Sequence, residues 1–229
     1  MAAAKNALLI FYWLVLLVGC YLIYHENFFY AAFAKAALMP ALFAYLFVSL
    51  KRTHSYILKI YFLSAIGTAW VGDVFGIVGG DSFLMIGILN HAISNLGYTL
   101  AFRKIRPIKL ANSIRASFGF IGFAVSIFCT FFFVAPIKDL GHFFPFYLLY
   151  TIFICSTGVY ACNILESTSR KRLSTHYFLP GSILTLASLG AYFFNKYHFH
   201  EPSMDVISYL TYGYAQVLFI NGFRKTARE

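Results

Sequence analysis

Long apolar stretches separated by short polar segments follow one another along the whole chain. A helix needs about 20 apolar residues to cross the hydrocarbon core of a bilayer. The pattern predicts eight such helices, at about 7–24, 31–50, 56–78, 83–102, 118–134, 143–165, 178–194 and 206–223. We therefore expect an all-α integral membrane protein with eight transmembrane helices, in which residues 1–229 form a single domain.

Composition supports a membrane protein over a soluble one. Of the 229 residues 60% are hydrophobic and 11% are charged, whereas soluble domains carry about 25% charged residues. The net charge of +10 would suggest a nucleic-acid partner in a soluble protein. Here the basic residues lie between the apolar stretches, so we expect no nucleic-acid partner. The apolar run after MAAAK is interpreted as the first transmembrane helix and not as a removed leader.

Lysine and arginine are distributed unevenly between the two predicted membrane sides. Fifteen of the 18 fall on the side that would hold both termini. The positive-inside rule places that side in the cytoplasm, and the expected location is the inner membrane of a bacterium. Lys35 lies on the opposite side, in the first turns of its predicted helix, where its side chain can reach the lipid headgroups.

Polar residues inside apolar stretches are the candidates for a site, because in a bilayer such residues usually face the protein interior or a wet cavity. Asp73 and His91 lie on the two arms of one predicted helical hairpin, around which the other helices are expected to pack. A rise of about 1.5 Å per residue brings five residues of four helices to similar depth in the outer half of the membrane, if those helices are neighbours: Asp73, His91, Ser188, Tyr212 and Gln216.

Each of these residues also has a structural interpretation. Asp73 is compatible with a hydrogen bond to another helix, and His91 with a satisfied interior histidine. Asn95 and its polar neighbours can hold helices together, and Tyr98 and Tyr212 can be packed rings. The cysteines form no CxxC pair, and the histidines of 198–200 lack further ligands nearby, so we expect no metal ion, cofactor or disulfide.

Three sequence runs resemble the YhhN family of lysoplasmalogenases: WVGDVF at 70–75, FLMIGILNHAISNLGY at 83–98 and TYGYAQVLFINGF at 211–223. The positions that match the family pattern are Gly72, Asp73, Gly87, Tyr98, Tyr212, Ala215 and Gln216. The chain departs from the pattern at three places. Met39 replaces the family lysine before Pro40, unless Lys35 substitutes for it from one turn earlier. Asn95 holds the family histidine position with His91 one turn earlier, and Leu189 replaces an aspartate after Ser188. The chain is thus similar to a divergent member.

The resemblance implies a membrane hydrolase that cleaves the vinyl ether of lysoplasmalogen, so the expected partner is a membrane lysophospholipid or lysoplasmalogen. Protonation of the β-carbon of a vinyl ether forms an oxocarbenium ion, which water attacks. The site must therefore supply an acid, negative charge and an aligned water. We expect Asp73 to be the acid or cation stabiliser and His91 its partner or the water-orienting base. The residues expected to position water and headgroup are Asn95, Tyr98, Ser188, Tyr212 and Gln216.

A non-catalytic membrane protein that binds lipid or a small molecule, or a transporter, is the main alternative. Asn95 and Leu189 favour it, because both replace chemically active family residues. Carriers often use helices broken by glycine or proline at mid-depth, for which the chain offers Pro40 and the Gly72/Gly76 pair. A scaffold subunit is a third interpretation. A long apolar tunnel to Asp73 would favour a lipid, and a water-filled vestibule through the molecule would favour transport.

Overall fold

The computed structural model describes residues 2–49, 56–78, 80–108, 113–134 and 140–226. Within these ranges the fold is all-α and contains no strand, as the apolar stretches predict. The long helices are α1 (Ala2–Tyr24), α2 (Phe28–Ser49), α3 (Tyr56–Val78), α4 (Asp81–Ile105), α5 (Ile114–Cys129), α7 (Phe144–Ile164), α9 (Leu179–Phe194) and α10 (Pro202–Thr226). Short helical segments adjoin them: η2 (Thr130–Val134), η3 (Gly141–Phe143), α8 (Lys171–Leu173), η4 (Ser174–Phe178) and η5 (Asn195–Phe199).

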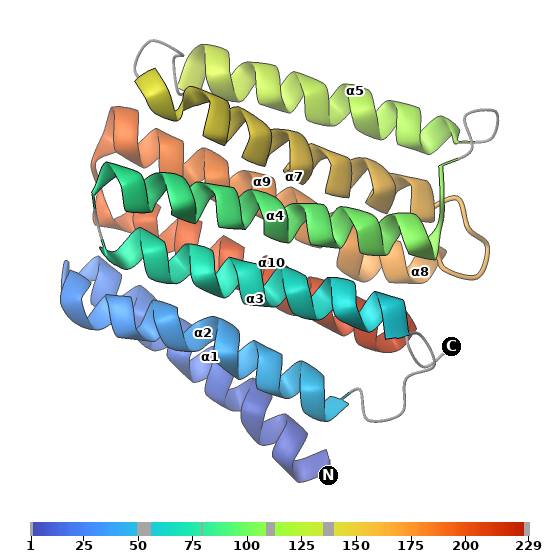
Figure 1. Ribbon diagram of the computed structural model, residues 1–229, viewed down its shortest axis with the longest axis horizontal. Coiled ribbons are helices and arrows are strands. Elements are labelled where there is room, and N and C mark those ends of the chain that lie inside the picture. The colour runs from blue at the N-terminus through green and yellow to red at the C-terminus, as the bar shows by residue number, and fades with distance from the viewer. Residues whose placement is uncertain (1, 50–55, 79, 109–112, 135–139, 227–229) are drawn as a thin grey trace.

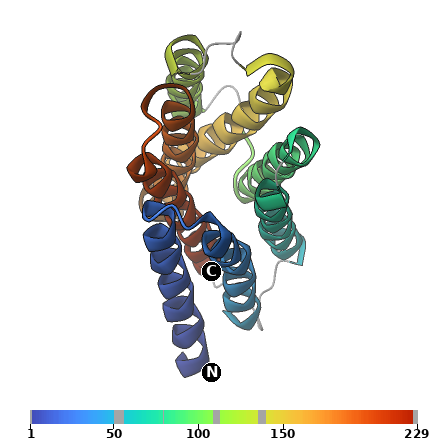
Figure 2. The ribbon, with the colours of Figure 1, turned by 90° about the vertical axis from the view of Figure 1, so that its left-hand side faces the viewer.

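The helices form a ring with one helix outside it (Figures 1 and 2). In the described ranges each of seven helices contacts the next, in the order α1, α2, α3, α4, α7, α9, α10 and back to α1. Helix α5 lies outside this ring, against α7. The expectation that the other helices surround the α3–α4 hairpin is therefore wrong. That hairpin is part of the wall, because α2 and α7 flank it on its two sides.

Six helical stretches in the described part of the chain are long and apolar enough to cross a membrane: Lys5–Tyr24, Phe28–Ser49, Tyr56–Val78, Ile114–Phe132, Gly141–Ile164 and Lys171–Phe199. Helices α4 and α10 are not among them, although each has 25 residues. Large apolar side chains lie exposed on the outside of the bundle, such as Ile10 of α1 at 59% and Phe118 of α5 at 71%. These features are consistent with a multi-pass membrane protein.

The helix boundaries differ most from the sequence prediction around α9. The helical stretch runs from Lys171 to Phe199, well beyond the predicted 178–194. Wider turns at η4 and η5 continue the helix through polar residues that resemble loop sequence. At its end the Asn195 side chain accepts a hydrogen bond from the Glu201 backbone N–H at 2.6 Å. Helix α10 then begins at Pro202, four residues before the predicted start. The predicted loop at 51–55 lies outside the described residues, as do residues 135–139 of the predicted loop that precedes 143.

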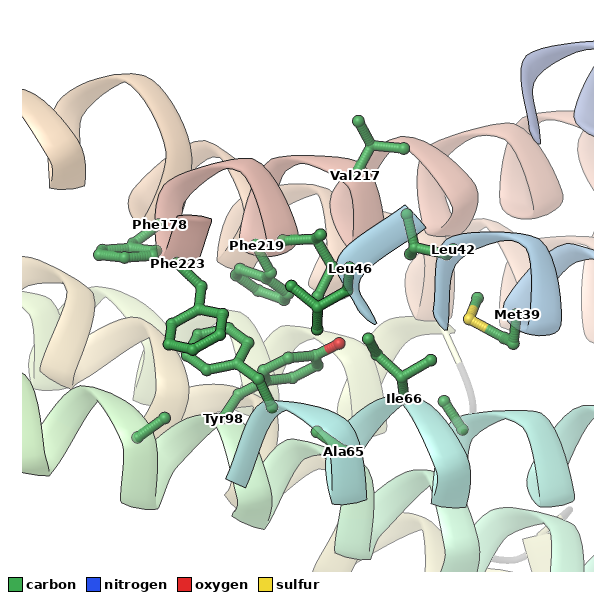
Figure 3. Packing of buried hydrophobic residues seen from close by; sticks show 14 of the residues in the cluster. Met39, Leu42, Leu46, Ala65, Ile66, Tyr98, Phe178, Val217, Phe219 and Phe223 are labelled. Atoms are coloured by element: carbon green, nitrogen blue, oxygen red, sulfur yellow. The ribbon is translucent and has the colours of Figure 1, made fainter. Parts of the chain in front are cut away.

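A core of aromatic and aliphatic side chains fills the ring on the side of the two chain termini (Figure 3). The Phe62 and Phe223 rings stack with centroids 4.1 Å apart, and Phe102 lies 4.4 Å from Phe178. All four of these rings are fully buried. This packed half of the ring adjoins the half that contains a pocket.

Candidate active site

A pocket of about 450 Å³ lies within the ring of helices. Every member of the ring, from α1 to α10, contributes to its lining. The lining residues of α1, α3 and α9 lie toward the ends of these helices, whereas those of α2, α4 and α10 lie toward their starts. The pocket therefore occupies the half of the bundle away from the chain termini, which both lie toward the right in Figure 1. Most of the lining is apolar or aromatic, and its ionisable side chains other than tyrosine are Lys35, Asp73, His91 and Asp205.

Asp73 is the most deeply buried charged group of this pocket, with 1% of its surface exposed. Its inward direction follows from the pattern of α3, whose buried residues recur every three or four positions from Leu58 to Asp73. The Tyr212 hydroxyl donates a hydrogen bond to Asp73 Oδ2 at 3.2 Å. The other oxygen, Oδ1, is buried and has no hydrogen-bond partner among the described residues. Asp73 thus has one oxygen that accepts a hydrogen bond and one that accepts none among the described residues.

His91 faces the free oxygen of Asp73 from helix α4. Its Nε2 atom lies 3.6 Å from Asp73 Oδ1. Two tyrosine rings flank the imidazole, Tyr150 with centroids 5.9 Å apart and Tyr212 at 5.7 Å and edge-on. The imidazole is therefore oriented by ring contacts from α7 and α10.

Two glycines allow α3 and α4 to approach closely at this level. A Cβ atom on Gly72 would lie 3.0 Å from the Gly87 carbonyl oxygen and 3.0 Å from His91 Nε2. A Cβ atom on Gly87 would lie 3.1 Å from the Gly72 carbonyl oxygen. Because real Cβ atoms seldom come so near, larger residues here would push the helices apart. The glycines thereby set the separation of Asp73 and His91.

The Lys35 side chain faces the pocket and not the lipid headgroups. Its Nζ atom lies 3.9 Å from Asp73 Oδ1, and its side chain lines the pocket, although the sequence also allows it to reach the headgroups. The side chain keeps 37% exposure. Helix α2 is held against α3 at this point by Trp70, whose indole N–H donates to the Ala36 carbonyl at 2.9 Å. The contact between the two helices brings the ammonium group to the carboxyl.

Ser188 and Ser208 join α9 to α10 at the wall of the pocket. The Ser188 hydroxyl donates to the Ser208 carbonyl at 2.8 Å, and the Ser208 hydroxyl donates to the Ser188 carbonyl at 2.9 Å. Both residues line the pocket, as does Leu189 beside them. Through these reciprocal hydrogen bonds, Ser188 helps to hold α9 against α10.

Three of the candidate residues lie below the pocket and not in its lining. Tyr98 donates a hydrogen bond to Gln216 Oε1, and both side chains are buried. The Asn95 amide donates to the His91 carbonyl at 3.1 Å, and its Oδ1 atom has no hydrogen-bond partner among the described residues. The structure thus brings Asp73, His91, Ser188 and Tyr212 together and places Asn95, Tyr98 and Gln216 one layer deeper, toward the termini.

Sequence reasoning missed several lining residues. Tyr147 and Tyr150 of α7 and Tyr192 of α9 lie in continuous apolar runs, where nothing distinguishes a lining tyrosine from an interfacial one. The predicted helix at 206–223 leaves Asp205 in a loop, whereas in the structure it lies in the first turn of α10 and lines the pocket. An earlier start for the last helix would have found it, because Asp205, Ser208, Tyr209 and Tyr212 follow the spacing of one helix face.

The comparisons with known proteins agree with the resemblance noted in the sequence. The sequence model of the YhhN family matches residues 30–223, which is most of the chain. The chain belongs to the YhhN family. Neither curated proteins nor solved structures give a match to it.

Membership of the YhhN family explains why the matching residues gather around one place. Gly72, Asp73, Gly87 and Tyr212 all line the pocket, although they come from three helices. Leu189, where the family pattern has an aspartate, also lines it. The described residues contain no group of three or more His, Cys, Asp or Glu side chains that could hold a metal ion. The groups closest to the Asp73 carboxyl that could exchange protons with it are His91 at 3.6 Å and Lys35 at 3.9 Å.

Proposed function

We propose that the chain is a membrane hydrolase of the lysoplasmalogenase type, which cleaves the vinyl ether bond of lysoplasmalogen lipids. The observation that carries this proposal is the Asp73 carboxyl, 1% exposed, whose Oδ1 atom accepts no hydrogen bond among the described residues and lies 3.6 Å from His91 and 3.9 Å from Lys35. An unsatisfied buried oxygen is unfavourable by about 1–3 kcal/mol. A packing role alone would not require that oxygen to stay free, whereas a reaction would.

Hydrolysis can proceed by proton transfers between Asp73, the substrate, water and His91. Asp73 in its acid form donates a proton to the β-carbon of the vinyl ether, and the carbon–carbon double bond supplies the electron pair. The resulting carboxylate lies beside the oxocarbenium ion and stabilises it electrostatically. Water then attacks the cationic carbon while His91 accepts its proton. The hemiacetal so formed collapses to an aldehyde and a glycerophospho-base, and the proton returns from His91 to Asp73.

Neighbouring residues assist these steps in the proposal. Tyr212 fixes the carboxyl through its bond to Oδ2. Lys35, 3.9 Å from Oδ1, stabilises the carboxylate that forms when Asp73 has given up its proton. Ser188 lies in the wall against which the headgroup would rest. Asn95, Tyr98 and Gln216 support His91 and the floor of the pocket from below.

The proposal includes eight membrane spans with both termini in the cytoplasm of a bacterium. Helices α4 and α10 have 25 residues each, about 37 Å at 1.5 Å per residue, which exceeds the hydrocarbon thickness. Several of their polar residues, among them Asn95 and Gln216, are buried inside the bundle, where a membrane helix tolerates them. Basic residues such as Arg103, Arg170 and Arg224 lie at the end of the bundle that holds the termini. The positive-inside rule assigns that end to the cytoplasm.

The test is aldehyde release by the protein purified in detergent. Incubation with lysoplasmenylethanolamine is expected to release an aldehyde, whereas a lysolipid with an ester bond is expected to remain intact. Asp73→Asn is expected to lower the rate by about a hundredfold or more, because it removes the proton donor. The matched control is Asp81→Asn, whose carboxyl is 75% exposed at the start of α4. Normal turnover by Asp73→Asn would rule the mechanism out.

A lipid-binding protein without catalysis is the second candidate, and Leu189 favours it. This residue, 5% exposed, lines the pocket at the position where the family pattern carries a second carboxylate. A transporter is less well supported, because the aromatic core and the Tyr98–Gln216 bond fill the ring beneath the pocket. Folded, monodisperse protein that retains a lysolipid in native mass spectrometry but releases no aldehyde would establish the binding protein.

A further inference from the structure

The pocket contains a second carboxylate that the proposed mechanism does not use. Asp205 lies in the first turn of α10, is half-buried and lines the pocket. It has no ion-pair partner within the described parts of the chain. A negative charge at a helix start is stabilised by the helix dipole. That effect explains why the charge is tolerated, but it does not explain why the side chain faces a cavity.

The position of Asp205 along α10 determines how far it lies, along the helix axis, from Tyr212 and the groups beside it. Asp205 precedes Tyr212 by seven residues, two helical turns, which is about 10 Å along the axis. Both side chains line the same pocket, and Tyr212 bonds to Asp73. In a lysoplasmalogen about nine single bonds separate the vinyl ether oxygen from the headgroup nitrogen, an extended length of roughly 10 Å for bonds near 1.5 Å. A lipid whose vinyl ether lies at Asp73 can therefore place its nitrogen at Asp205.

The charges of the pocket are ordered in the same way as those of a zwitterionic headgroup. Lys35 lies seven residues into α2, about 10 Å from the end of the bundle, and Asp205 only three residues into α10, about 5 Å from it. The cation is thus the deeper charge and the anion the outer one. In choline and ethanolamine lipids the phosphate lies nearer the glycerol and the ammonium group lies farther out. The order of charges in the pocket is complementary to this arrangement.

An aromatic residue adjoins Asp205 on the same helix face. Tyr209, four residues later, is 6% exposed and lines the pocket, and its hydroxyl has no hydrogen-bond partner among the described residues. Tyrosine rings attract ammonium and quaternary ammonium groups through cation–π interactions. A carboxylate beside an aromatic ring is a combination that suits such a cation.

We propose that Asp205 binds the ammonium group of the lipid headgroup and thereby selects lysolipids with choline or ethanolamine over those that end in a bare phosphate. This inference rests on the proposed function only in taking a lysolipid as the occupant of the pocket. It requires no bond to be cleaved. Asp205 is a specificity-determining residue in this proposal and takes no part in the proton transfers.

The test measures binding of two alkyl-ether lysolipids that have no vinyl ether to hydrolyse. One carries a phosphocholine headgroup and the other a bare phosphate, and the full-length protein in detergent is titrated with each. Wild-type protein is expected to prefer phosphocholine, and Asp205→Asn is expected to reduce that preference about fivefold, as for loss of one partly exposed ion pair. Asp205→Lys is expected to reverse it. The matched control, Glu201→Gln, removes a carboxylate that does not line the pocket and is expected to keep the preference.

The outcomes separate this inference from the hydrolase proposal. An unchanged preference in both Asp205 variants, with protein that remains monodisperse, would overturn the role of Asp205 even if aldehyde is released. A changed preference without aldehyde release would support Asp205 and contradict the hydrolase. Equal binding of the two lipids by wild-type protein would overturn the inference directly. If Asp205→Asn is poorly folded, Asp205→Glu supplies the comparison, and it is expected to keep the preference for phosphocholine.

Discussion

The two carboxyl oxygens of Asp73 lie in different surroundings, and they contact different residues. Tyr212 holds Oδ2 by a hydrogen bond, whereas Oδ1 faces His91 and Lys35 without one. A carboxyl held on one side keeps a fixed direction in the pocket. In the proposed mechanism the other oxygen then keeps one orientation toward the reacting carbon, which is the geometric condition for efficient proton transfer.

Tyr212→Phe is expected to lower aldehyde release about tenfold while the protein stays folded. The phenyl ring retains the edge-on contact with His91, but the hydrogen bond to Asp73 is lost, which is worth about 1 kcal/mol or somewhat more. Turnover of lysoplasmenylethanolamine and the melting temperature in detergent are the two measurements. Tyr214→Phe on the same helix is the control, because Tyr214 is 45% exposed and contacts Trp13 instead. Equal losses in the two variants would contradict the role of the Tyr212 hydroxyl.

The sequence predicts the placement of some site residues and not others for a physical reason. Asp73 and Tyr212 stand out because a polar group inside an apolar helix has to face the interior, and the pocket does contain both. Lys35 lies near a helix start, where lysine can also reach the headgroups, so only the contact between α2 and α3 decides its direction. Tyr150 gives no signal, because tyrosine is common at the membrane interface as well.

Glycine spacing determines how α3 and α4 pack. Gly72 and Gly87 face each other so closely that a Cβ atom on either would lie within 3.1 Å of the opposite backbone. Small residues at helix crossings are a common way for membrane helices to approach each other. The close approach is what brings His91 of one helix within 3.6 Å of Asp73 on the other.

Gly72→Ala is expected to destabilise the protein by about 1–3 kcal/mol and to reduce activity, because overpacking a tight helix contact forces the helices apart. The added methyl group would also press on the His91 ring, 3.0 Å away. Gly67→Ala, on the same helix, is the control, since nothing lies within 4 Å of its Cβ position. Thermal unfolding in detergent compares the two variants. A Gly72→Ala protein as stable and active as Gly67→Ala would show that the helices adjust without strain.

Helix ends were harder to predict than helix cores. The continuous apolar run of α9 predicts the central part of this helix. It does not predict the extensions at the two ends, because Ser174 and Asn195 are residues typical of loops. In the structure Ser174 is fully buried and donates to the Ala161 carbonyl, while Asn195 closes the turn into α10. Such tertiary hydrogen bonds extend a helix beyond the point where local sequence would end it.

The whole molecule has two unlike ends. Aromatic packing fills the end with the termini, and the pocket occupies the other. Apolar runs and the distribution of basic residues predict the helices and their direction. They do not predict the closed ring, because the order in which apolar helices contact one another depends on side-chain shape, which hydropathy does not describe.

The orientation is tested by two cysteines at opposite ends, introduced after the native cysteines have been replaced. Asn27→Cys lies in the α1–α2 turn and Ser169→Cys in the segment before α8, and both positions are exposed. A membrane-impermeant maleimide is expected to label Asn27→Cys in intact cells and Ser169→Cys only after permeabilisation, as the positive-inside rule requires. The reverse labelling pattern would invert the proposed topology.

The position of the pocket in one half of the ring has a consequence for lipid traffic in the proposed function. A lysolipid whose headgroup enters from one end of the ring must come from the leaflet on that side, because the packed core fills the interior toward the other leaflet. Lysolipids of the opposite leaflet then have to cross the bilayer before the protein can reach them. In a sealed vesicle with uniformly oriented protein, consumption would be fast for one half of the lysolipid pool. The second half would follow at the rate of transbilayer exchange.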